Sequence, residues 1–474
     1  MPDRYHIHTA AAPARFHRIG KFGSVDWRED CSRCSNCVKP RCLYEVYRHE
    51  SSFNRDPTVP VQPVNECRAC FSCVQGCTKG LLNISISPEF LDMGDAHWTP
   101  DILLSTWNQS DAGTIPVSGA GYRGRFHGPG FDSIWTDMSE IVRPTRDGIH
   151  GREYISTSVD IGPKPMRLDF APDGRMLTKP SRLIEIQIPA ILDMPAWPMQ
   201  GGDPVEARLT AAKELSSLAV ISASDAAAAR PDQLRFAVPV LSREDVRRSQ
   251  AILDAVRMVE VRDRPDVADL AFELQARNTQ SIVAIRLELR PSTADRVTLL
   301  ARAGTKVFHL CADPHGRERS EDGQAGRHMK DVLREVHGRL VKEGMRDEVT
   351  LIASGGIALA EHMAKAIICG ADLVAVDTAL QVALGCRVCR SGHAAASDSP
   401  CPAAVGSTDS AYAAQRMVNL MGAWHNQLIE VLGAMGIREV RRLRGEVGRA
   451  MFLEDIENEA FGDIARLPRA RVSP

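Results

Sequence analysis

Two short runs of cysteine carry the clearest chemistry in this sequence. CSRCSNCVKPRC begins at residue 31 and CRACFSCVQGC at residue 67, and each places three cysteines at two-residue spacing before a fourth. Three thiolates at this spacing can bind three corners of an iron–sulfur cubane, and the fourth cysteine of such a run ligates the other cluster of a two-cluster protein. The runs therefore predict two 4Fe–4S clusters. One would be held by Cys31, Cys34, Cys37 and Cys77, and the other by Cys67, Cys70, Cys73 and Cys42.

Structural zinc sites are the alternative for these runs, because they also use C-x2-C pairs. Zinc sites divide four ligands into two pairs, whereas each run here has three evenly spaced cysteines and one more distant one, which favours clusters. The last cysteine of each run is followed by Leu43 or Thr78 rather than by proline. In this detail both runs differ from the usual bacterial ferredoxin pattern.

A third group of cysteines comes much later in the chain. Cys386, Cys389 and Cys401 directly follow an apolar, strand-like run at 372–380. Three ligands would suit a 3Fe–4S cluster, or a 4Fe–4S cluster with a fourth ligand from elsewhere. Zinc with His393 as the fourth ligand is the alternative.

Composition favours a protein of a reducing, intracellular compartment. The chain has 474 residues and a net charge of −2, which gives no field that would attract nucleic acid or a membrane surface. No leader-like apolar segment and no run of about 18 apolar residues is present, so we expect a cytoplasmic protein without a membrane span. In a reducing compartment, 13 cysteines indicate metal binding rather than disulfides.

The elements that must position a site lie after residue 180. Eight short apolar, β-branched runs alternate with helix-like stretches, at 183–192, 218–223, 234–241, 258–263, 281–289, 306–313, 349–354 and 372–380. This alternation predicts parallel strands and an α/β fold, a (β/α)8 TIM-type barrel, with a doubly wound sheet as the alternative.

Four regions are expected in all. Residues 20–90 would form a two-cluster, ferredoxin-like α+β domain, and 91–180 an irregular connecting region. Residues 181–410 would form the barrel with its cysteine loop. Residues 411–474 would add a C-terminal helical segment, because the apolar residues of 413–437 recur on one helical face.

In a barrel, chemistry lies at the carboxyl ends of the strands, and loops seven and eight commonly bind phosphate. The seventh candidate strand ends in Ser354, Gly355 and Gly356, and bare glycine amides can approach phosphate oxygens closely. With clusters on the same chain, flavin mononucleotide (FMN) is the cofactor that fits best, because it converts single-electron into two-electron chemistry.

Three charged residues are candidates for catalysis at the same mouth. Asp313 and His315 follow the sixth strand, where ordinary polar loop residues are the alternative. Arg286 lies within the fifth strand, where it would either face a flavin and an acidic substrate or form a core ion pair with Glu288 or Glu260. All three could hold an anionic substrate or supply a proton.

The stretch GMRDEVTLIASGGIALAEHMAKAIICGADLVAVDTALQVALGC and the later CPAAVGSTD resemble the FMN-binding synthase domain of ferredoxin-dependent and archaeal-type glutamate synthases. The resemblance implies an FMN barrel with a 3Fe–4S loop and a two-cluster ferredoxin domain ahead of it. It matches Ser354, Gly355 and Gly356 to the flavin-phosphate motif, Gly370 and Ala371 to a second phosphate-side turn, and Arg286 to a strand lysine facing the flavin. Two glycine-rich stretches of that family are replaced here, by LCADPHGRERS and VRDRPD.

The resemblance implies an oxidoreductase in which electrons pass from ferredoxin-type clusters to FMN and reduce 2-iminoglutarate to L-glutamate. Ferredoxin or another electron donor, a separate glutaminase or reductase subunit and a small-molecule substrate are the expected partners, and we expect an oligomer. Two alternatives remain: the same cofactors acting on another amine or amino acid, or a non-catalytic electron-transfer subunit of a larger complex.

Overall fold

The computed structural model describes residues 5–16, 19–31, 38–44, 70–115, 128–136, 155–164, 168–178, 182–197, 204–248, 250–277, 281–319, 326–389 and 409–465. Within these residues, no helix is both long and apolar enough to cross a membrane.

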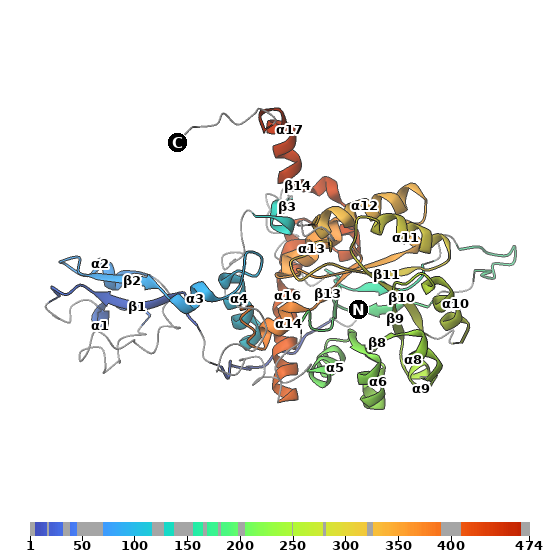
Figure 1. Ribbon diagram of the computed structural model, residues 1–474, viewed down its shortest axis with the longest axis horizontal. Coiled ribbons are helices and arrows are strands. Elements are labelled where there is room, and N and C mark those ends of the chain that lie inside the picture. Colours follow the sequence, from blue (N-terminus) through green and yellow to red (C-terminus); the bar gives the residue numbers. More distant parts are fainter. Residues whose placement is uncertain are drawn as a thin grey trace.

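A closed barrel of eight parallel strands forms the largest part of the molecule (Figure 1). In chain order the strands are β6 (Ala190–Leu192), β7 (Ala219–Ser222), β8 (Ala237–Leu241), β9 (Met258–Arg262), β10 (Ile282–Glu288), β11 (Val307–Cys311), β12 (Thr350–Ser354) and β13 (Leu373–Val376). The barrel closes where β13 pairs with β6. All eight predicted strands are therefore confirmed, and the doubly wound alternative is wrong.

Helices follow the strands around the outside of the barrel. They are α5 (Val205–Glu214), α6 (Ala223–Ala228), α7 (Pro231–Leu234), α8 (Arg243–Arg248), α9 (Gln250–Ala255), α10 (Val267–Arg277), α11 (Thr293–Arg302), α12 (Met329–Lys342), α13 (Ala360–Ile368) and α14 (Thr378–Ala383). Every residue of β8, β11, β12 and β13 is buried, because helices cover the outer face and side chains fill the interior. This double burial explains why the strand runs are continuously apolar.

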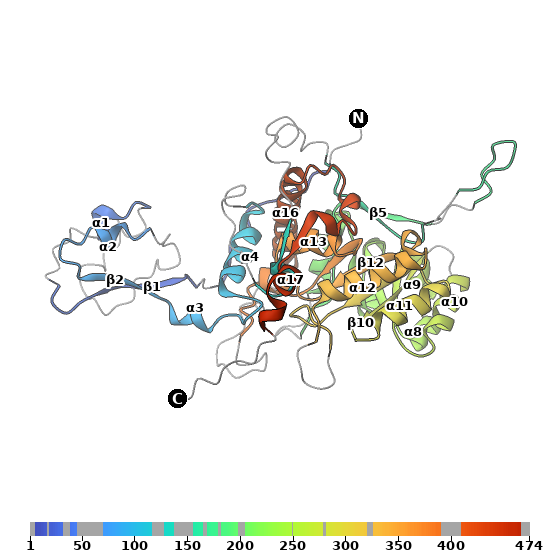
Figure 2. The same cartoon turned by 90° about the horizontal axis from the view of Figure 1, so that it is seen from above.

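The N-terminal part extends from one side of the barrel in both ribbon views (Figure 1, Figure 2). Strand β1 (Phe22–Trp27) pairs antiparallel with β2 (Leu82–Ile86). The short helices α1 (Val38–Arg41) and α2 (Ser72–Gln75) contact each other. The region expected to be a ferredoxin-like domain thus contains, among the described residues, two short helices between two paired strands.

The connecting region contains more structure than the sequence indicated. It includes the end of α3 (Pro88–Asp92), α4 (Pro100–Ala112), the 3-10 helix η3 (Gly130–Ser133) and the strands β3 (Ile134–Thr136) and β4 (Val159–Ile161). Strand β4 pairs with β5 (Ile184–Ile186), which is the first part of the apolar run at 183–192. Helix α4 begins with proline at its first position and buries Ile102, Leu103 and Trp107. It packs on α14 and on α16 (Ser410–Ala434), so the expected irregular linker is in part a component of the core.

The C-terminal helical segment is present. Helix α16 buries Met417, Leu420, Trp424 and Leu428 against α4, α5 and α13, as the apolar spacing predicted. It is followed by the 3-10 helices η7 (Val440–Leu443) and η8 (Val447–Arg449), by β14 (Ala450–Phe452), which pairs with β3, and by α17 (Leu453–Ala465).

Candidate functional site

A cavity of about 850 Å³ opens at the carboxyl ends of the barrel strands. Its walls come from residues at the ends of β6, β9, β10, β11, β12 and β13 and from the loops that follow several of these strands. The charged or polar lining residues are Asp193, Arg262, Asp263, Arg264, Arg286, Glu288, Arg290, Arg296, Asp313, Arg319, Ser354 and Asp377. This is the face of the barrel where active sites are found, and we call it the mouth cavity.

Arg286 lies at the floor of the mouth cavity within a buried ionic network. Its guanidinium donates to both carboxylate oxygens of Asp193, at 3.0 and 2.8 Å, and to Glu260 at 3.1 Å. Burial alone would raise the pKa of Asp193, but the adjacent Arg286 and His309 charges lower it to about 2. The proposed ion pair of Arg286 with Glu260 is thus present, and Arg286 also lines the cavity.

His309 completes the network beneath Arg286. Its Nδ1 lies 2.7 Å from Glu260 Oε1, and both side chains are fully buried. Burial lowers the pKa of His309, but the Cys311 sulfur and the carboxylates of Glu260 and Asp193 raise it to about 10 overall. The protonated ring donates from Nδ1 to Glu260, so the 3.1 Å approach of Arg286 to the same nitrogen is not a hydrogen bond.

Asp377 is the second carboxylate at the floor. It follows β13, and its side chain accepts from the backbone N–H of Thr378 at 2.5 Å at the start of α14. Burial, followed by the charge of Asp193, raises the pKa of Asp377 to about 6. The two neighbouring carboxyl groups therefore differ in pKa, because only Asp193 has an arginine partner.

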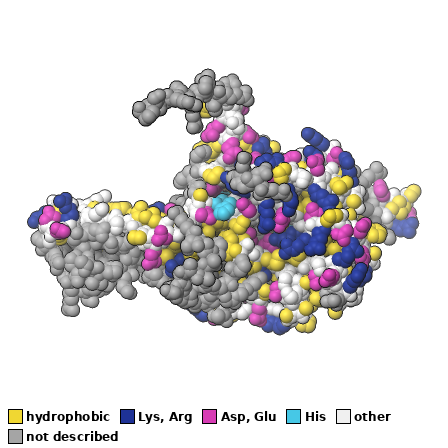
Figure 3. Space-filling model, viewed as in Figure 1, with side chains coloured by type: hydrophobic (Ala, Val, Ile, Leu, Met, Phe, Trp, Pro, Cys, Tyr) yellow, Lys and Arg dark blue, Asp and Glu magenta, His cyan; other side chains and the backbone are white. Residues whose placement is uncertain are grey.

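The rim of the mouth cavity is rich in arginine. Arg296 forms a two-pronged ion pair with Asp263, whereas Arg290 and Arg319 share the exposed Glu288 at 3.8 and 3.4 Å. Arg262 and Arg264 add two more exposed cations from the end of β9. Lys and Arg side chains also gather over the barrel on the face shown in Figure 3. The positive excess at the rim suits an anionic ligand.

Ser354 ends β12 and Gly355 and Gly356 follow it, as predicted, but of the three only Ser354 lines the mouth cavity. A Cβ on Gly355 would lie 2.6 Å from the carbonyl oxygens of Ala312 and Asp313, and one on Gly356 would lie 2.4 Å from the Gly316 nitrogen. The two glycines have positive φ and are buried beneath the loop after β11. Their requirement for glycine is explained by this protein contact, not by an open phosphate cradle.

Gly370 and Ala371 lie at the opposite end of the barrel. They precede β13, whose first residue Leu373 pairs with Ile352 in the middle of β12, so they lie at the amino ends of the strands and away from the loops at the mouth. The expected second phosphate-side turn is therefore misplaced, and the residues that follow the eighth strand are Asp377 and Thr378.

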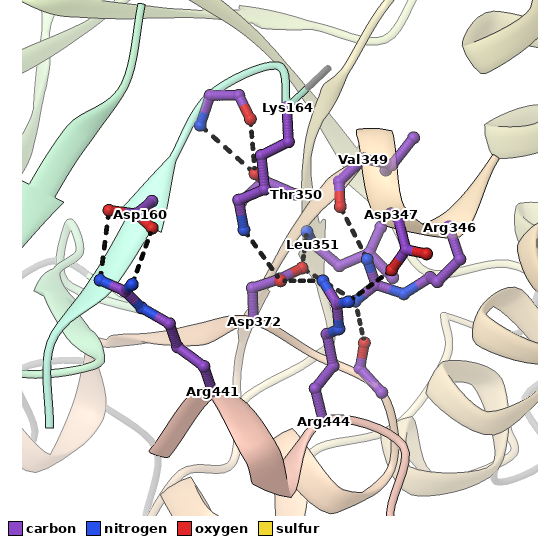
Figure 4. Close-up of polar contacts among 12 residues, drawn as sticks. Asp160, Lys164, Arg346, Asp347, Val349, Thr350, Leu351, Asp372, Arg441 and Arg444 are labelled. Atoms are coloured by element: carbon purple, nitrogen blue, oxygen red, sulfur yellow. Dashed lines mark hydrogen bonds and ion pairs between the residues drawn. The ribbon is translucent and has the colours of Figure 1, made fainter. Parts of the chain in front are cut away.

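Gly370 belongs instead to a structural cluster at the amino ends of the strands (Figure 4). Its carbonyl accepts from Arg346, which also binds the buried Asp372 at 2.8 Å. Asp372 further accepts from Arg444 at 3.1 Å and lies 3.7 Å from Lys164. We call these four charged residues the lower ion cluster.

Asp313 and His315 hold the loop after β11 in place. Asp313 lines the mouth cavity, and its Oδ1 accepts from the backbone N–H groups of His315 and Arg317. His315 lies outside the cavity lining and pairs with Asp95 at 2.8 Å, a hydrogen bond that raises the pKa of His315. The structure thus brings Arg286 and Asp313 to one cavity and turns His315 away towards the segment before α4.

The predicted cluster ligands are only partly within the described residues. Cys34, Cys37, Cys67 and Cys401 lie outside them, and the described ligands are Cys31, Cys42, Cys70, Cys73, Cys77, Cys386 and Cys389. The Cys77 sulfur accepts from the Leu81 amide at 3.3 Å, and such backbone contacts lower the pKa of Cys77, which favours the ligating thiolate. A Cβ on Gly76 would overlap the Arg41 side chain, so the ends of the two cysteine runs approach each other.

Both described C-x2-C turns share an unusual backbone. Phe71 follows Cys70 with φ 55°, and Val388 precedes Cys389 with φ 47°. A left-handed conformation is unfavourable for both of these side chains. Arg387, within the second turn, accepts at its carbonyl from Gly94 at 3.0 Å. The segment after the N-terminal part is therefore fastened directly to the third cysteine loop.

Asp132, Glu361 and His362 lie close enough together to raise the question of a metal site. The Nδ1 atom of His362 accepts from the Ala358 amide at 3.2 Å, so in the neutral ring Nε2 carries the hydrogen and donates to Asp132 at 2.9 Å. Glu361 in turn binds Lys365. These contacts fasten η3 to α13 and leave no imidazole lone pair for a metal.

Four residues of the site were not predicted as functional: Asp193, Glu260, His309 and Asp377. Glu260 and His309 each interrupt an apolar strand run, MVEVRD and KVFHLCAD, and a charged or polar residue in a strand buried on both faces is a usable signal. Asp193 and Asp377 follow strands directly, which is the position where barrel enzymes place reactive groups. Cys311 also lines the mouth cavity.

Comparisons with known proteins identify relatives. Residues 244–438 match the family described as a conserved region in glutamate synthase. The chain is 23% identical to the archaeal-type glutamate synthase (NADPH) of Dehalococcoides mccartyi, with 89% of this chain and 93% of that protein covered. It is 24% identical to the archaeal glutamate synthase (NADPH) of Archaeoglobus fulgidus, with 94% and 97% covered. The predicted resemblance to archaeal-type glutamate synthases is confirmed over most of the chain.

Among solved structures, a lactate oxidase of Pediococcus acidilactici aligns with a TM-score of 0.39 and 13% identity, covering 72% of this chain and 92% of that one. A flavocytochrome B2 aligns with a TM-score of 0.38 and 12% identity, covering 72% and 87%.

Proposed function

We propose that this chain is an iron–sulfur flavoprotein oxidoreductase of the glutamate synthase type, which reduces 2-iminoglutarate to L-glutamate in the mouth cavity. The observation that carries the proposal is the cavity itself, at the carboxyl ends of a (β/α)8 barrel in a chain similar to glutamate synthases along most of its length. The similarity favours this activity over a purely electron-transferring role.

The residues of the mouth cavity fit FMN in size and charge. About 850 Å³ is within the range of ligand pockets, roughly 300–1,000 Å³. Ser354 ends β12 and lines the mouth cavity, whereas the buried Thr378, two residues after β13, does not line it. Because Gly355 and Gly356 are covered, the phosphate would be bound by other groups that line the cavity, such as the Ser354 hydroxyl.

Bound FMN would supply hydride to the substrate carbon and accept electrons singly from the clusters. The residues of this chain have separate roles around it. The rim arginines Arg262, Arg264 and Arg290 would bind the substrate carboxylates, because they are cationic and exposed at the cavity edge. Arg286 forms ion pairs with Asp193 and Glu260. It would therefore position Asp193 and neutralise these two carboxylates rather than bind the substrate.

The order of parts along the chain would give an electron path. The two clusters of the N-terminal part would receive electrons, and the Cys386, Cys389 and Cys401 loop would hold the third cluster between them and the cavity. The hydrogen bond from the Gly94 amide to the Arg387 carbonyl supports this order, because it joins the segment that follows the N-terminal part to the third cysteine loop.

The test begins with the anaerobically purified chain. We expect one FMN and roughly eight to twelve irons per chain, with the absorption of a flavin and of iron–sulfur clusters. Glutamate should form from 2-oxoglutarate and ammonia when reduced ferredoxin or NADPH is supplied, NADPH being the donor named for the relatives. Colourless protein after cluster and flavin reconstitution would contradict the proposal.

The same experiment distinguishes the alternatives. Bleaching of bound flavin by another amine or amino acid, without glutamate formation, would indicate the same cofactors with a different substrate. Loaded protein that turns over no amine, but co-purifies with a dehydrogenase, would indicate an electron-transfer subunit.

A further inference from the structure

Asp193 and Asp377 form a carboxylate pair at the floor of the mouth cavity. They follow β6 and β13, the two strands that close the barrel, where Leu192 pairs with Val376. The Asp193 amide donates to the Val376 carbonyl at 2.8 Å, so the two aspartates occupy adjacent positions on neighbouring strands. Both line the cavity.

The two carboxylates have different partners. Asp193 accepts from both Arg286 nitrogens and from the Met194 amide. Asp377 accepts from the Thr378 amide, and among the described residues no cation is paired with it. A carboxyl group that is buried beside an ionised neighbour, without its own cation, has a raised pKa and so keeps its proton at higher pH than an ordinary aspartate.

We propose that the carboxyl group of Asp377 donates and accepts the proton of the reaction in the mouth cavity, and that Asp193 and Arg286 are positioning residues for it. The inference rests on the proposed function. Reduction of a carbon–nitrogen double bond places a hydride, supplied by reduced flavin, on carbon and one proton on nitrogen. Asp377 would give that proton as its O–H bond breaks, and water would reprotonate the carboxylate before the next turnover.

The charged groups around Asp377 leave it as the suitable acid. Arg208 of α5 binds the Asp193 carbonyl, and Arg286 of β10 and Asp193 of β6 bind each other. Glu260 of β9 and His309 of β11 are hydrogen-bonded to each other and do not line the cavity. The Arg286–Asp193 and Glu260–His309 pairs are mutually neutralised, and the Arg208 guanidinium keeps its proton, so none of these groups competes for the transferred proton.

The other lining acids are engaged elsewhere. Asp263 is paired with Arg296, Glu288 lies against Arg290 and Arg319, and Asp313 accepts from two backbone amides. Cys311 lines the cavity too, with its thiol directed at the His309 carbonyl. Among the lining acids, Asp377 therefore remains the one suited to donate a proton, because its pKa is raised to about 6.

Asp377→Asn is the decisive variant because asparagine keeps the helix cap of α14 and removes only the acid. In the full-length holoprotein we expect kcat to fall roughly a hundredfold or more, as for loss of a general acid. Asp377→Glu should recover part of that loss. Asp232→Asn, an exposed aspartate of α7, is the matched control and should leave kcat unchanged.

Infrared spectroscopy gives a readout that does not depend on turnover. The wild-type protein should show a protonated carboxyl C=O band that disappears as pH rises through about 6. The band should be absent from Asp377→Asn and present in Asp232→Asn. A band that persists in Asp377→Asn, or no such band in the wild type, would overturn the inference.

The two proposals fail in different ways. If the protein binds flavin and turns over, but Asp377→Asn keeps the wild-type rate and pH profile, Asp377 is not the acid while the proposed function stands. If wild type and variant both lack flavin, the proposed function fails. A carboxyl titration lost only in Asp377→Asn would then still support an acid role for Asp377 in another reaction in the cavity.

Discussion

At the scale of single residues, the floor of the mouth cavity contains buried charges that neutralise one another. Arg286 is largely buried, and Asp193 and Glu260 are 2% and 0% exposed at the side chain. A buried charge is tolerable only while its partners remain, because removing one partner leaves the others uncompensated. Arg286 therefore stabilises the fold by neutralising two buried carboxylates.

Arg286→Met should destabilise the fold by about 3–5 kcal/mol, because it leaves Asp193 and Glu260 buried without their arginine. Arg290→Met removes an exposed arginine from the same cavity and should change stability by about 0.5 kcal/mol or less. Urea unfolding of the two variants measures the difference. Equal losses would mean that the network adds nothing at the cavity floor.

Part of this network, the ion pair of Arg286 with Glu260, could be predicted from the sequence. Arg286 and Glu260 stand out because each is a charge within an apolar strand run. Asp193 could not be paired with Arg286 in advance, since the two are 93 positions apart and meet only when β6 and β10 take their places in the closed barrel. The strands could be read from local periodicity, but side-chain partners across the barrel depend on closure.

At the scale of elements, the loop after β11 covers Gly355 and Gly356, the two glycines that follow β12. Trp98 donates to the Pro314 carbonyl, His97 Nε2 lies 2.9 Å from the Gly356 carbonyl, and His315 binds Asp95. These contacts hold the loop against the segment before α4. A glycine pair after a strand predicted a phosphate site, but the covering loop comes from a long-range contact that no local pattern reveals.

Gly355→Ala should cost roughly 1–3 kcal/mol more than Gly304→Ala. Both glycines have positive φ, at 94° and 106°, so the backbone strain of a Cβ is similar. Only at Gly355 would the Cβ strike other atoms, the carbonyls of Ala312 and Asp313, while nothing lies within 4 Å at Gly304. Thermal unfolding compares the variants. Equal costs would show that the loop does not pack on Gly355 in solution.

The lower ion cluster connects Asp372, just before β13, to Lys164, Arg346 and Arg444 in three other segments of the chain. Burial would raise the pKa of Asp372, but Arg346, Lys164 and Arg444 lower it to about 2, below the value near 3.9 of an unfolded aspartate. Because the folded-state pKa is the lower one, the carboxylate stabilises the fold fully above pH ~4 and loses that contribution as pH falls towards 2.

Asp372→Asn should therefore lower the free energy of unfolding by about 2–3 kcal/mol at neutral pH, and the difference from wild type should shrink in acid. Denaturant unfolding at a series of pH values measures it. Asp347→Asn removes a neighbouring, exposed partner of Arg444 and is the control, with little change expected. A difference that stayed constant down to pH ~2 would contradict the assigned pKa.

At the scale of the whole molecule, the proposed electron transfer requires the N-terminal part, the third cysteine loop and the mouth cavity to lie close to one another. The alternation of strands and helices predicted the barrel, and the cysteine spacing predicted where clusters would be placed at each end of the chain. The connection between them was not predictable, because Gly94 and Arg387 are far apart in sequence and bond through the backbone. The packing of α4 on α14 and α16 fixes the same junction.

Cys386→Ser tests this junction. If the third cysteine loop holds a cluster between the N-terminal part and the cavity, the variant should lose roughly three to four irons per chain and keep its flavin. Flavin reduction by the external electron donor should then slow at least tenfold, because the path lacks its middle centre, while flavin reduction by an amine substrate should be unchanged. Iron analysis and stopped-flow absorbance measure these effects.

Cys369→Ala is the matched control, since Cys369 is fully buried at the end of α13 and burial raises its pKa to about 12, so it stays an inert thiol. Its iron content and both reduction rates should equal those of the wild type. Unchanged iron in Cys386→Ser would mean that the loop holds no cluster. Lost iron with unslowed reduction by the external donor would mean that electrons reach the cavity without passing this loop.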